Sequence, residues 1–323
     1  MIRSKKRLLR AILWSAAGLI LFANLAAYWQ VRSMTHYSTA SERTTSIEKL
    51  TFRQRVEVLL EGANLPRPVL DHTPWDYGLD FNSFRVPVDS QITLDVWEIP
   101  CSIPSGTVIL FHGYGAAKSD LLSEAKAFRG MGYSCWLVDF RGSGSSTGNE
   151  TSIGYYEADD VAAVCQEYRR RDTLPLILYG VSMGAASILR AVAVEGVRPN
   201  GIIIEGIFDR MLTTVANRFH IMKLPAFPLA NLLVFWGGVD QGFDAFDNNP
   251  VDYALHIPCP VLQLHGALDR RATLADAQAV FRNLRDPKEL VVFEQTGHES
   301  CLASDPVLWK QSVLKFCRGI AEK

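Results

Sequence analysis

The stretch Leu176-Ile177-Leu178-Tyr179-Gly180-Val181-Ser182-Met183-Gly184-Ala185-Ala186 decides the fold that we predict for this chain. An apolar run leads into Gly-x-Ser-x-Gly and then into small helix-forming residues, as a strand, a sharp turn and a helix require. At so tight a turn Ser182 takes a strained backbone conformation, and side chains two residues to either side would collide with the neighbouring strand and helix. Ser182 is therefore the candidate nucleophile.

Short apolar runs rich in Val, Ile and Leu recur along the chain and alternate with helical patterns. Strands that are buried on both faces show such runs, and their alternation with helices predicts an α/β fold with a mostly parallel sheet. The predicted strands are 107–111, 135–138, 176–179, 202–204, 261–264 and 290–293, and the predicted helices are 120–129, 155–171, 185–195, 274–284 and 307–320. Ahead of them, 84–88 and 92–99 alternate apolar and polar residues and predict an antiparallel hairpin at the sheet edge.

One interval is longer than a single crossover helix needs. Residues 208–255 lie between two predicted strands and include the apolar stretch 219–236. We expect an inserted cap over the carboxyl edge of the sheet, with Trp236-Gly237-Gly238 at one of its turns. The alternative is an ordinary pair of long helices that has no role in substrate binding.

A serine hydroxyl becomes a strong nucleophile only when a base removes its proton and an acid orients that base. Among the seven histidines, His298 has the best position, because it follows the last predicted strand at the edge where Ser182 lies. Asp269 follows the strand 261–264 and reaches the same edge, where its carboxylate would hold the imidazole in the right tautomer. The order Ser182, Asp269, His298 thus predicts a catalytic triad. Taken singly, Asp269 could equally cap its own loop.

Two backbone amides are the candidate donors of an oxyanion hole. His112-Gly113-Tyr114-Gly115 follows the strand 107–111, and its glycines allow N–H groups to face the reacting carbonyl. The donors would be the amides of Tyr114 and of Met183, the residue directly after the nucleophile. A phosphate-binding role for these glycines is the alternative, but the loop matches neither the dinucleotide nor the P-loop pattern.

Composition and charge exclude several functional classes. The 323 residues carry a formal net charge of -1, so no nucleic acid partner is expected. The six cysteines have no C-x-x-C spacing, which argues against a zinc ribbon or a thioredoxin-type site and leaves one disulfide open. The predicted chemistry requires neither a metal nor an organic cofactor. The sequence does not indicate an oligomeric state.

The N-terminal segment predicts a membrane anchor. Basic residues cluster in 1–10, and the apolar segment 11–31 has about the 20 residues that a helix needs to cross a bilayer. The positive-inside rule keeps the N-terminus cytoplasmic and places the main domain on the extracytoplasmic side, the periplasm in a bacterium. A cleaved signal peptide is the alternative, although its apolar region is usually only about 7–15 residues long. Residues 32–80 then form a membrane-proximal spacer with a helix at 47–60, and 81–323 form the main domain.

These motifs together resemble the α/β-hydrolase superfamily. The resemblance runs from about Phe84 to the C-terminus and rests on five motifs in the superfamily's order: His112-Gly113-Tyr114-Gly115, 139–146, 180–184, 265–269 and Gly297-His298. The anchor and the short cap are similar to membrane-anchored serine hydrolases of the α/β-hydrolase domain-containing type, which cleave carboxylic esters or thioesters, often in lipids. The resemblance implies an acyl-enzyme on Ser182 that water releases, and a small-molecule or lipid ester as substrate.

Three other functions are compatible with the same residues. A serine peptidase or amidase has an identical triad, and Asp240, Asp244 and Asp247 of the expected cap are candidates for binding a substrate's free amino terminus. An acyltransferase would use the same triad and would differ from a hydrolase only in excluding water from the active site. A non-catalytic, membrane-tethered binding domain would not need the complete triad, which argues against it.

Overall fold

The computed structural model describes residues 2–39, 44 and 51–321, and in them eight strands form one sheet. The order across the sheet is β1-β2-β4-β3-β5-β6-β7-β8; β2 runs antiparallel to β1 and β4, and the other neighbours are parallel. The predicted α/β fold and its antiparallel edge hairpin are confirmed. The strands are β1 (Asn82–Pro87), β2 (Thr93–Ile99), β3 (Thr107–Phe111), β4 (Ser134–Val138), β5 (Leu176–Val181), β6 (Gly201–Glu205), β7 (Val261–Gly266) and β8 (Lys288–Phe293).

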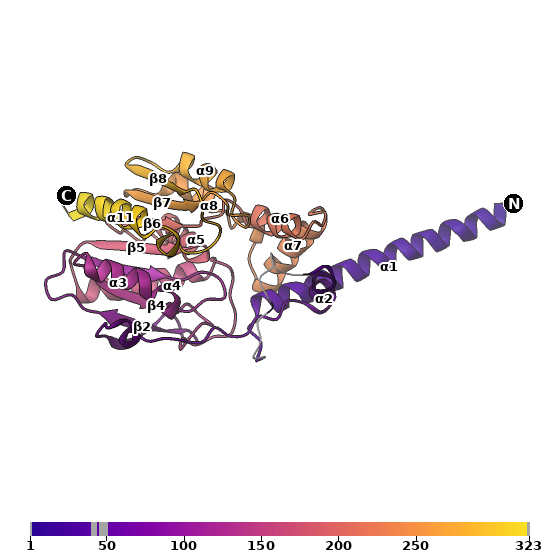
Figure 1. Cartoon of the computed structure of the whole chain (residues 1–323). Helices are drawn as coiled ribbons and strands as arrows, with labels where there is room; N and C mark the ends of the chain where they lie inside the picture. The colour runs from indigo at the N-terminus through magenta and orange to yellow at the C-terminus, as the bar shows by residue number, and fades with distance from the viewer. Residues whose placement is uncertain (1, 40–43, 45–50, 322–323) are drawn as a thin grey trace.

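Helices cover both faces of the sheet because its central strands bury side chains on both sides. In β3, Val108 and Leu110 pack into the core on one face. Ile109 and Phe111 pack into the core on the other. The first face is covered by α3 (Leu122–Gly130), α10 (Cys301–Ser304) and α11 (Pro306–Ala321), and the second by α4 (Glu157–Arg171), α5 (Met183–Ala193), α8 (Pro250–Tyr253) and α9 (Leu274–Asn283) (Figure 1).

The N-terminal helix α1 (Ile2–Thr35) extends beyond the predicted span 11–31 at both ends. Among the described residues, Lys5–Thr35 is the one helical segment long and apolar enough to cross a membrane; its most apolar 18-residue window has a mean hydropathy of 1.8 and is 0% buried. Figure 1 shows its N-terminal part projecting far from the rest of the chain. Its last turns pack on α7 (Leu229–Gln241), where the Trp236 indole donates a 3.1 Å hydrogen bond to Asn24.

The interval between β6 and β7 is mostly helical. It holds α6 (Met211–Ile221), α7 and the short helices η4 (Ala245–Asp247), α8 and η5 (Ala254–His256). Figure 1 shows α6 and α7 between the sheet and α1. The turn predicted at Trp236-Gly237-Gly238 is wrong, because these residues lie inside α7. Gly238 serves close packing instead: a Cβ there would lie 2.6 Å from the carbonyl oxygen of Phe243.

The segment between α1 and the sheet packs against the main domain. Tyr37 is buried, and the Arg67 guanidinium donates to the carbonyl oxygens of Ser146 and, at 2.6 Å, of Gly148. Helix α2 (Phe52–Glu61) begins after Thr51, which forms a capping box with the side chain of the third helical residue. Positions 47–50 of the predicted helix lie outside the described residues. These contacts tie the end of α1 to the domain. Two further short helices among the described residues are η2 (Pro74–Tyr77) and η3 (Lys118–Leu121).

Candidate active site

Ser182 occupies the sharp turn between β5 and α5. Its φ is 52°, in a region that residues with side chains rarely adopt, so the predicted strain is confirmed. A Cβ at Gly184 would lie 2.3 Å from the carbonyl oxygen of Phe111, and a Cβ at Gly180 would lie 2.6 Å from the carbonyl carbon of Gly184. Real Cβ atoms do not approach so closely. The predicted need for glycine at both positions is therefore confirmed.

The structure brings the side chains of Ser182, His298 and Asp269 together. His298 Nε2 lies 3.2 Å from Ser182 Oγ, and His298 Nδ1 lies 2.6 Å from Asp269 Oδ2. The three residues follow β5, β8 and β7, and the carboxyl ends of parallel strands meet at one edge of a sheet. With Nδ1–H donating to the carboxylate, Nε2 can accept the proton of the Ser182 hydroxyl.

Asp269 is held in one orientation by its own loop. Its side chain is fully buried, and Oδ1 accepts hydrogen bonds from the N–H groups of Arg271 at 2.8 Å and Ala272 at 3.0 Å. Burial by itself would raise the pKa of this carboxyl. The hydrogen bond and charge of His298, together with the two backbone donors, outweigh burial and lower the pKa below its ordinary value. Asp269 is therefore an anion at neutral pH.

The two predicted oxyanion-hole residues come from different elements: Tyr114 from the loop after β3, and Met183 from the start of α5. Tyr114 lines the cavity above Ser182, and its hydroxyl donates a 2.6 Å hydrogen bond to the carbonyl oxygen of Met34 in α1. Met183 is the first residue of α5, where N–H groups have no partner within the helix. The role of these two amides as oxyanion donors stays a prediction.

Two buried histidines near the site, His112 and His265, have structural roles. In His112, Nδ1–H donates to the carbonyl oxygen of Gly113 at 2.8 Å, and Nε2 accepts from the N–H of Phe140 at 3.1 Å. Burial lowers the pKa of His112, which suits a neutral ring that donates at one nitrogen and accepts at the other. His265 Nε2–H donates to the carbonyl oxygen of Ala272 at 2.9 Å and thereby shapes the loop that holds Asp269.

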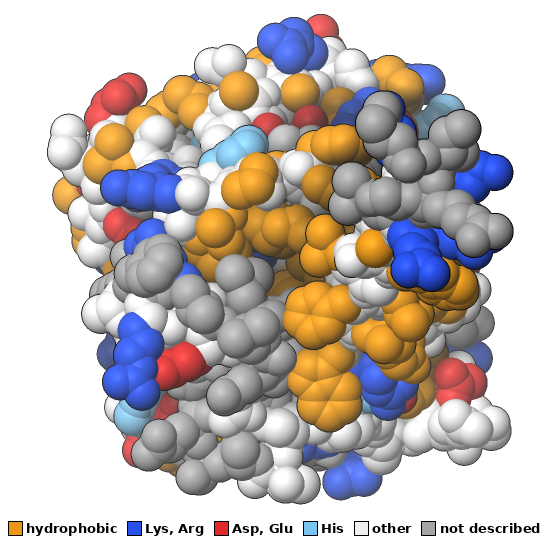
Figure 2. All heavy atoms as spheres, turned by 90° about the vertical axis from the view of Figure 1, so that its right-hand side faces the viewer, with side chains coloured by type: hydrophobic (Ala, Val, Ile, Leu, Met, Phe, Trp, Pro, Cys, Tyr) orange, Lys and Arg blue, Asp and Glu red, His pale blue; other side chains and the backbone are white. Residues whose placement is uncertain are grey.

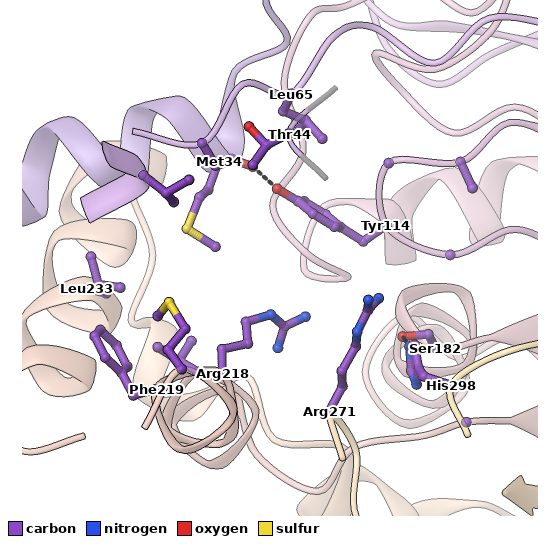
Figure 3. A pocket seen from close by; sticks show the side chains of 18 of the residues that line it. Met34, Thr44, Leu65, Tyr114, Ser182, Arg218, Phe219, Leu233, Arg271 and His298 are labelled. Carbon is purple, nitrogen blue, oxygen red and sulfur yellow. Dashed lines mark hydrogen bonds between the residues drawn. The ribbon is translucent and has the colours of Figure 1, made fainter. Parts of the chain in front are cut away.

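A cavity of about 1040 Å³ lies over Ser182 and His298. It is lined by α1, the loop after β3, the segment between α2 and β1, and the insertion between β6 and β7. Figure 3 shows Arg218 and Arg271 projecting into the cavity between the Ser182–His298 pair and an apolar end at Phe219 and Leu233. The cavity therefore has a reacting end in the main domain and an apolar end among α1, α6 and α7.

Sequence reasoning missed the wall that α1 contributes and both cavity arginines. The available signal in α1 was the row Leu19, Ala23, Ala26 and Gln30, whose spacing places these residues on one helix face. The sequence interpretation assigned the whole apolar segment to the bilayer. Arg271 lies two residues after Asp269 in the same loop, which was a local signal that it reaches the site.

The three aspartates that were candidates for binding an amino terminus do not line the cavity. Asp240 forms a 2.9 Å ion pair with Arg32 and accepts a 3.3 Å hydrogen bond from the Thr35 hydroxyl, so it ties the insertion to α1. Asp244 accepts a hydrogen bond from a backbone N–H at the start of η4, and Asp247 is the last residue of η4.

Two buried carboxylates also line the cavity. The carbonyl oxygen of Glu205 accepts a 2.8 Å hydrogen bond from the N–H of Ser182, and its carboxylate accepts one from the N–H of Cys301. The carboxylate of Glu124 accepts a 2.7 Å hydrogen bond from the Ser300 hydroxyl. Burial, helped by the charge of Glu205, raises the pKa of Glu124 from 4.5 to about 7.

Glu124→Gln is expected to flatten the dependence of stability on pH. Because the folded protein holds the Glu124 proton up to about pH 7, its free energy of unfolding decreases as pH rises from about 4.5 through 7. The decrease is on the order of 3 kcal/mol, at 1.36 kcal/mol for each pKa unit. Thermal unfolding near pH 5 and near pH 8 should show the variant gaining stability relative to the original protein at the higher pH. An equal response of both proteins to pH would contradict the assignment.

Neither a metal site nor a disulfide contributes to the described site. Within residues 2–39, 44 and 51–321, no group of three or more His, Cys, Asp or Glu side chains is arranged to hold a metal ion. All six cysteines are free thiols, which answers the question that the sequence left open.

The sequence of this chain is similar to a family of hydrolases and to two proteins of other organisms. The Hydrolase_4 family, described as serine aminopeptidase S33, matches residues 102–219. The uncharacterized protein YqkD of Bacillus subtilis is 25% identical over 247 residues, which cover 75% of this chain and 77% of YqkD. The uncharacterized membrane protein YNL320W of Saccharomyces cerevisiae is 25% identical over 197 residues, which cover 60% of this chain and 69% of that protein.

A solved structure also matches the fold of this chain. The Pyrococcus furiosus esterase Pf2001 superposes with a TM-score of 0.67 at 22% identity, covering 79% of this chain and 97% of the esterase. Identity at this level is evidence for the fold. The order of the strands, the serine turn after β5 and these matches agree with one another. The chain therefore has the α/β-hydrolase fold.

Proposed function

We propose that the protein is a serine hydrolase that cleaves a carboxylic ester or thioester through an acyl-enzyme. The observation that supports this most directly is the hydrogen-bonded series Ser182, His298, Asp269 beneath a cavity with an apolar end. Ser182 Oγ attacks the carbonyl carbon while His298 takes its proton and then passes it to the leaving group. The amides of Tyr114 and Met183 stabilise the oxyanion, and water, activated by His298, releases the acyl group.

The apolar end of the cavity favours an acyl group as the part of the substrate that enters it. Buried or half-buried side chains of the insertion, which we propose acts as a cap, line this end: Phe219, Met222, Leu229 and Leu233. An apolar wall releases water when it contacts an alkyl chain, at about 25 cal/mol for each Å² buried. The esterase described above, with the same fold, is consistent with this substrate class.

We also propose that α1 anchors the protein in a membrane, with the hydrolase domain on the extracytoplasmic side. The length and hydropathy of α1 support the anchor, and the basic residues before it support the orientation. The yeast relative that is described as a membrane protein is in accord with an anchor.

A second candidate function is that of an aminopeptidase. Two observations favour it: the description of the matching family, and Glu299, an exposed carboxylate that lines the cavity directly after His298. A peptidase of this kind needs a carboxylate to bind the substrate's amino group. The apolar end of the cavity is better matched to an acyl chain, so we place the esterase first.

The esterase and the aminopeptidase would act on substrates that differ in leaving group and in charge. Two sets of substrates therefore distinguish these functions. The full-length protein in detergent is assayed with p-nitrophenyl esters of increasing acyl length and with amino-acid p-nitroanilides. We expect turnover of the esters, with a maximum at one chain length. Turnover confined to the anilides would replace the esterase with the peptidase, and turnover of neither set would reject both.

A further inference from the structure

One face of α1 forms a long wall of the cavity. Its lining residues include Leu19, Phe22, Ala23, Ala26, Ala27 and Met34. Residues three or four apart on a helix lie on one face, so these side chains form a continuous strip. At 1.5 Å per residue the strip is roughly 22 Å long from Leu19 to Met34. Phe219 and Leu233 of the insertion line the same cavity, at its apolar end (Figure 3).

The end of this strip that is farthest from Ser182 lies at the protein surface. Leu19 and Phe22 line the cavity, yet 69% and 59% of their surfaces are exposed. Phe219, which lines the same cavity, is only 3% exposed. A residue that both lines a cavity and remains exposed lies at its mouth. Leu19 and Phe22 belong to the segment 11–31, so lipid would surround this mouth when α1 spans a membrane.

The insertion also exposes apolar side chains. Phe227, Phe235 and Val239 are 78%, 50% and 53% exposed, and Figure 2 shows apolar side chains gathered on the face from which α1 projects. Large exposed apolar surfaces mark contacts with a membrane or another protein. Phe235 and Val239 belong to α7, which packs on the proposed anchor helix α1, and this favours lipid as the contacting phase.

We propose that α1 is one wall of the acyl-binding pocket and that the substrate's acyl chain enters from the bilayer, between α1 and α6. The inference rests on the proposed ester hydrolysis and narrows its substrate class to lipids held in the membrane. The chain would lie along the α1 strip, with its carbonyl carbon at Ser182 Oγ. In this arrangement the anchor helix selects the substrate in addition to holding the protein at the membrane.

Ala26→Trp tests the wall, because it adds a large side chain within the strip. Ala17→Trp is the matched control, since position 17 is exposed and lies on the opposite side of α1. Both full-length proteins are reconstituted in phosphatidylcholine vesicles and assayed with p-nitrophenyl palmitate and p-nitrophenyl acetate. Ala26→Trp should lower the ratio of kcat/KM for palmitate to that for acetate by about tenfold or more, and Ala17→Trp should leave both values unchanged. An unchanged ratio in Ala26→Trp would overturn the proposal.

A second readout does not depend on catalysis. A diazirine-bearing palmitic acid in the same vesicles is photolysed, and the labelled residues are mapped by mass spectrometry. We expect a label at buried Phe219, lost in Ala26→Trp and kept in Ala17→Trp. If the original protein cleaves no ester but this pattern is found, the hydrolase proposal fails while the acyl pocket stands. If label is found only outside the cavity, the acyl pocket is rejected whatever the enzyme activity.

Discussion

The Ser182→Ala protein is expected to hydrolyse p-nitrophenyl esters with a kcat lower by roughly a millionfold, the loss typical when a catalytic serine is removed. His298 then has no hydroxyl to deprotonate, and only the oxyanion donors and the cavity still act on the substrate. The variant should also resist labelling by a fluorophosphonate, which reacts with activated serines. Steady-state kinetics and the mass of the labelled protein check the two expectations.

The matched control is Ser187→Ala in α5, the helix that begins directly after Ser182. The Ser187 hydroxyl is buried and donates a 2.8 Å hydrogen bond to the carbonyl oxygen of Met183, outside the residues that line the cavity. This variant should keep its fluorophosphonate labelling. Labelling of Ser182→Ala at the rate of the original protein would show that another residue is the nucleophile.

Asp269→Asn is expected to lower kcat by about ten-thousandfold, because it reverses the tautomer of His298. The backbone N–H groups of Arg271 and Ala272 donate to Oδ1, so an asparagine keeps its oxygen there and turns its NH₂ group toward His298 Nδ1. Nδ1 must then accept a hydrogen bond, and Nε2 carries the proton. Nε2 can no longer take the proton of Ser182. The measurement is kcat for a short p-nitrophenyl ester at neutral pH.

Asp244→Asn is the conservative control for this change. Asp244 is exposed, caps η4 through a backbone N–H, and lies outside the residues that line the cavity. Asparagine caps helices as well as aspartate does, so kcat should not change. If Asp269→Asn keeps a kcat within about tenfold of the original, Asp269 does not orient His298, and the alternative role as a loop-capping residue is favoured.

The strands and the helices beside them could be predicted because their signals are local. Continuous runs such as 176–179 indicate burial on both faces, and every predicted strand from 107–111 onward overlaps an observed one. The relation among Ser182, Asp269 and His298 followed from the same signals. Each residue comes just after a parallel strand, and parallel strands end at a common edge. The predicted turn at 236–238 failed because the close packing of Gly238 against Phe243 and Ala245, just beyond the end of α7, outweighed the local cost of glycine in a helix.

The sequence by itself therefore determined the sheet, the serine turn and the set of residues that meet at its edge. Only the tertiary structure decided what surrounds them: the α1 wall of the cavity, the ion pair between Arg32 and Asp240, and the contact of Glu124 with Ser300. The partners in the last two contacts are 208 and 176 residues apart in the chain. Periodicity and turn chemistry report a residue's immediate neighbours, whereas such contacts depend on how complete elements pack, which no local pattern encodes.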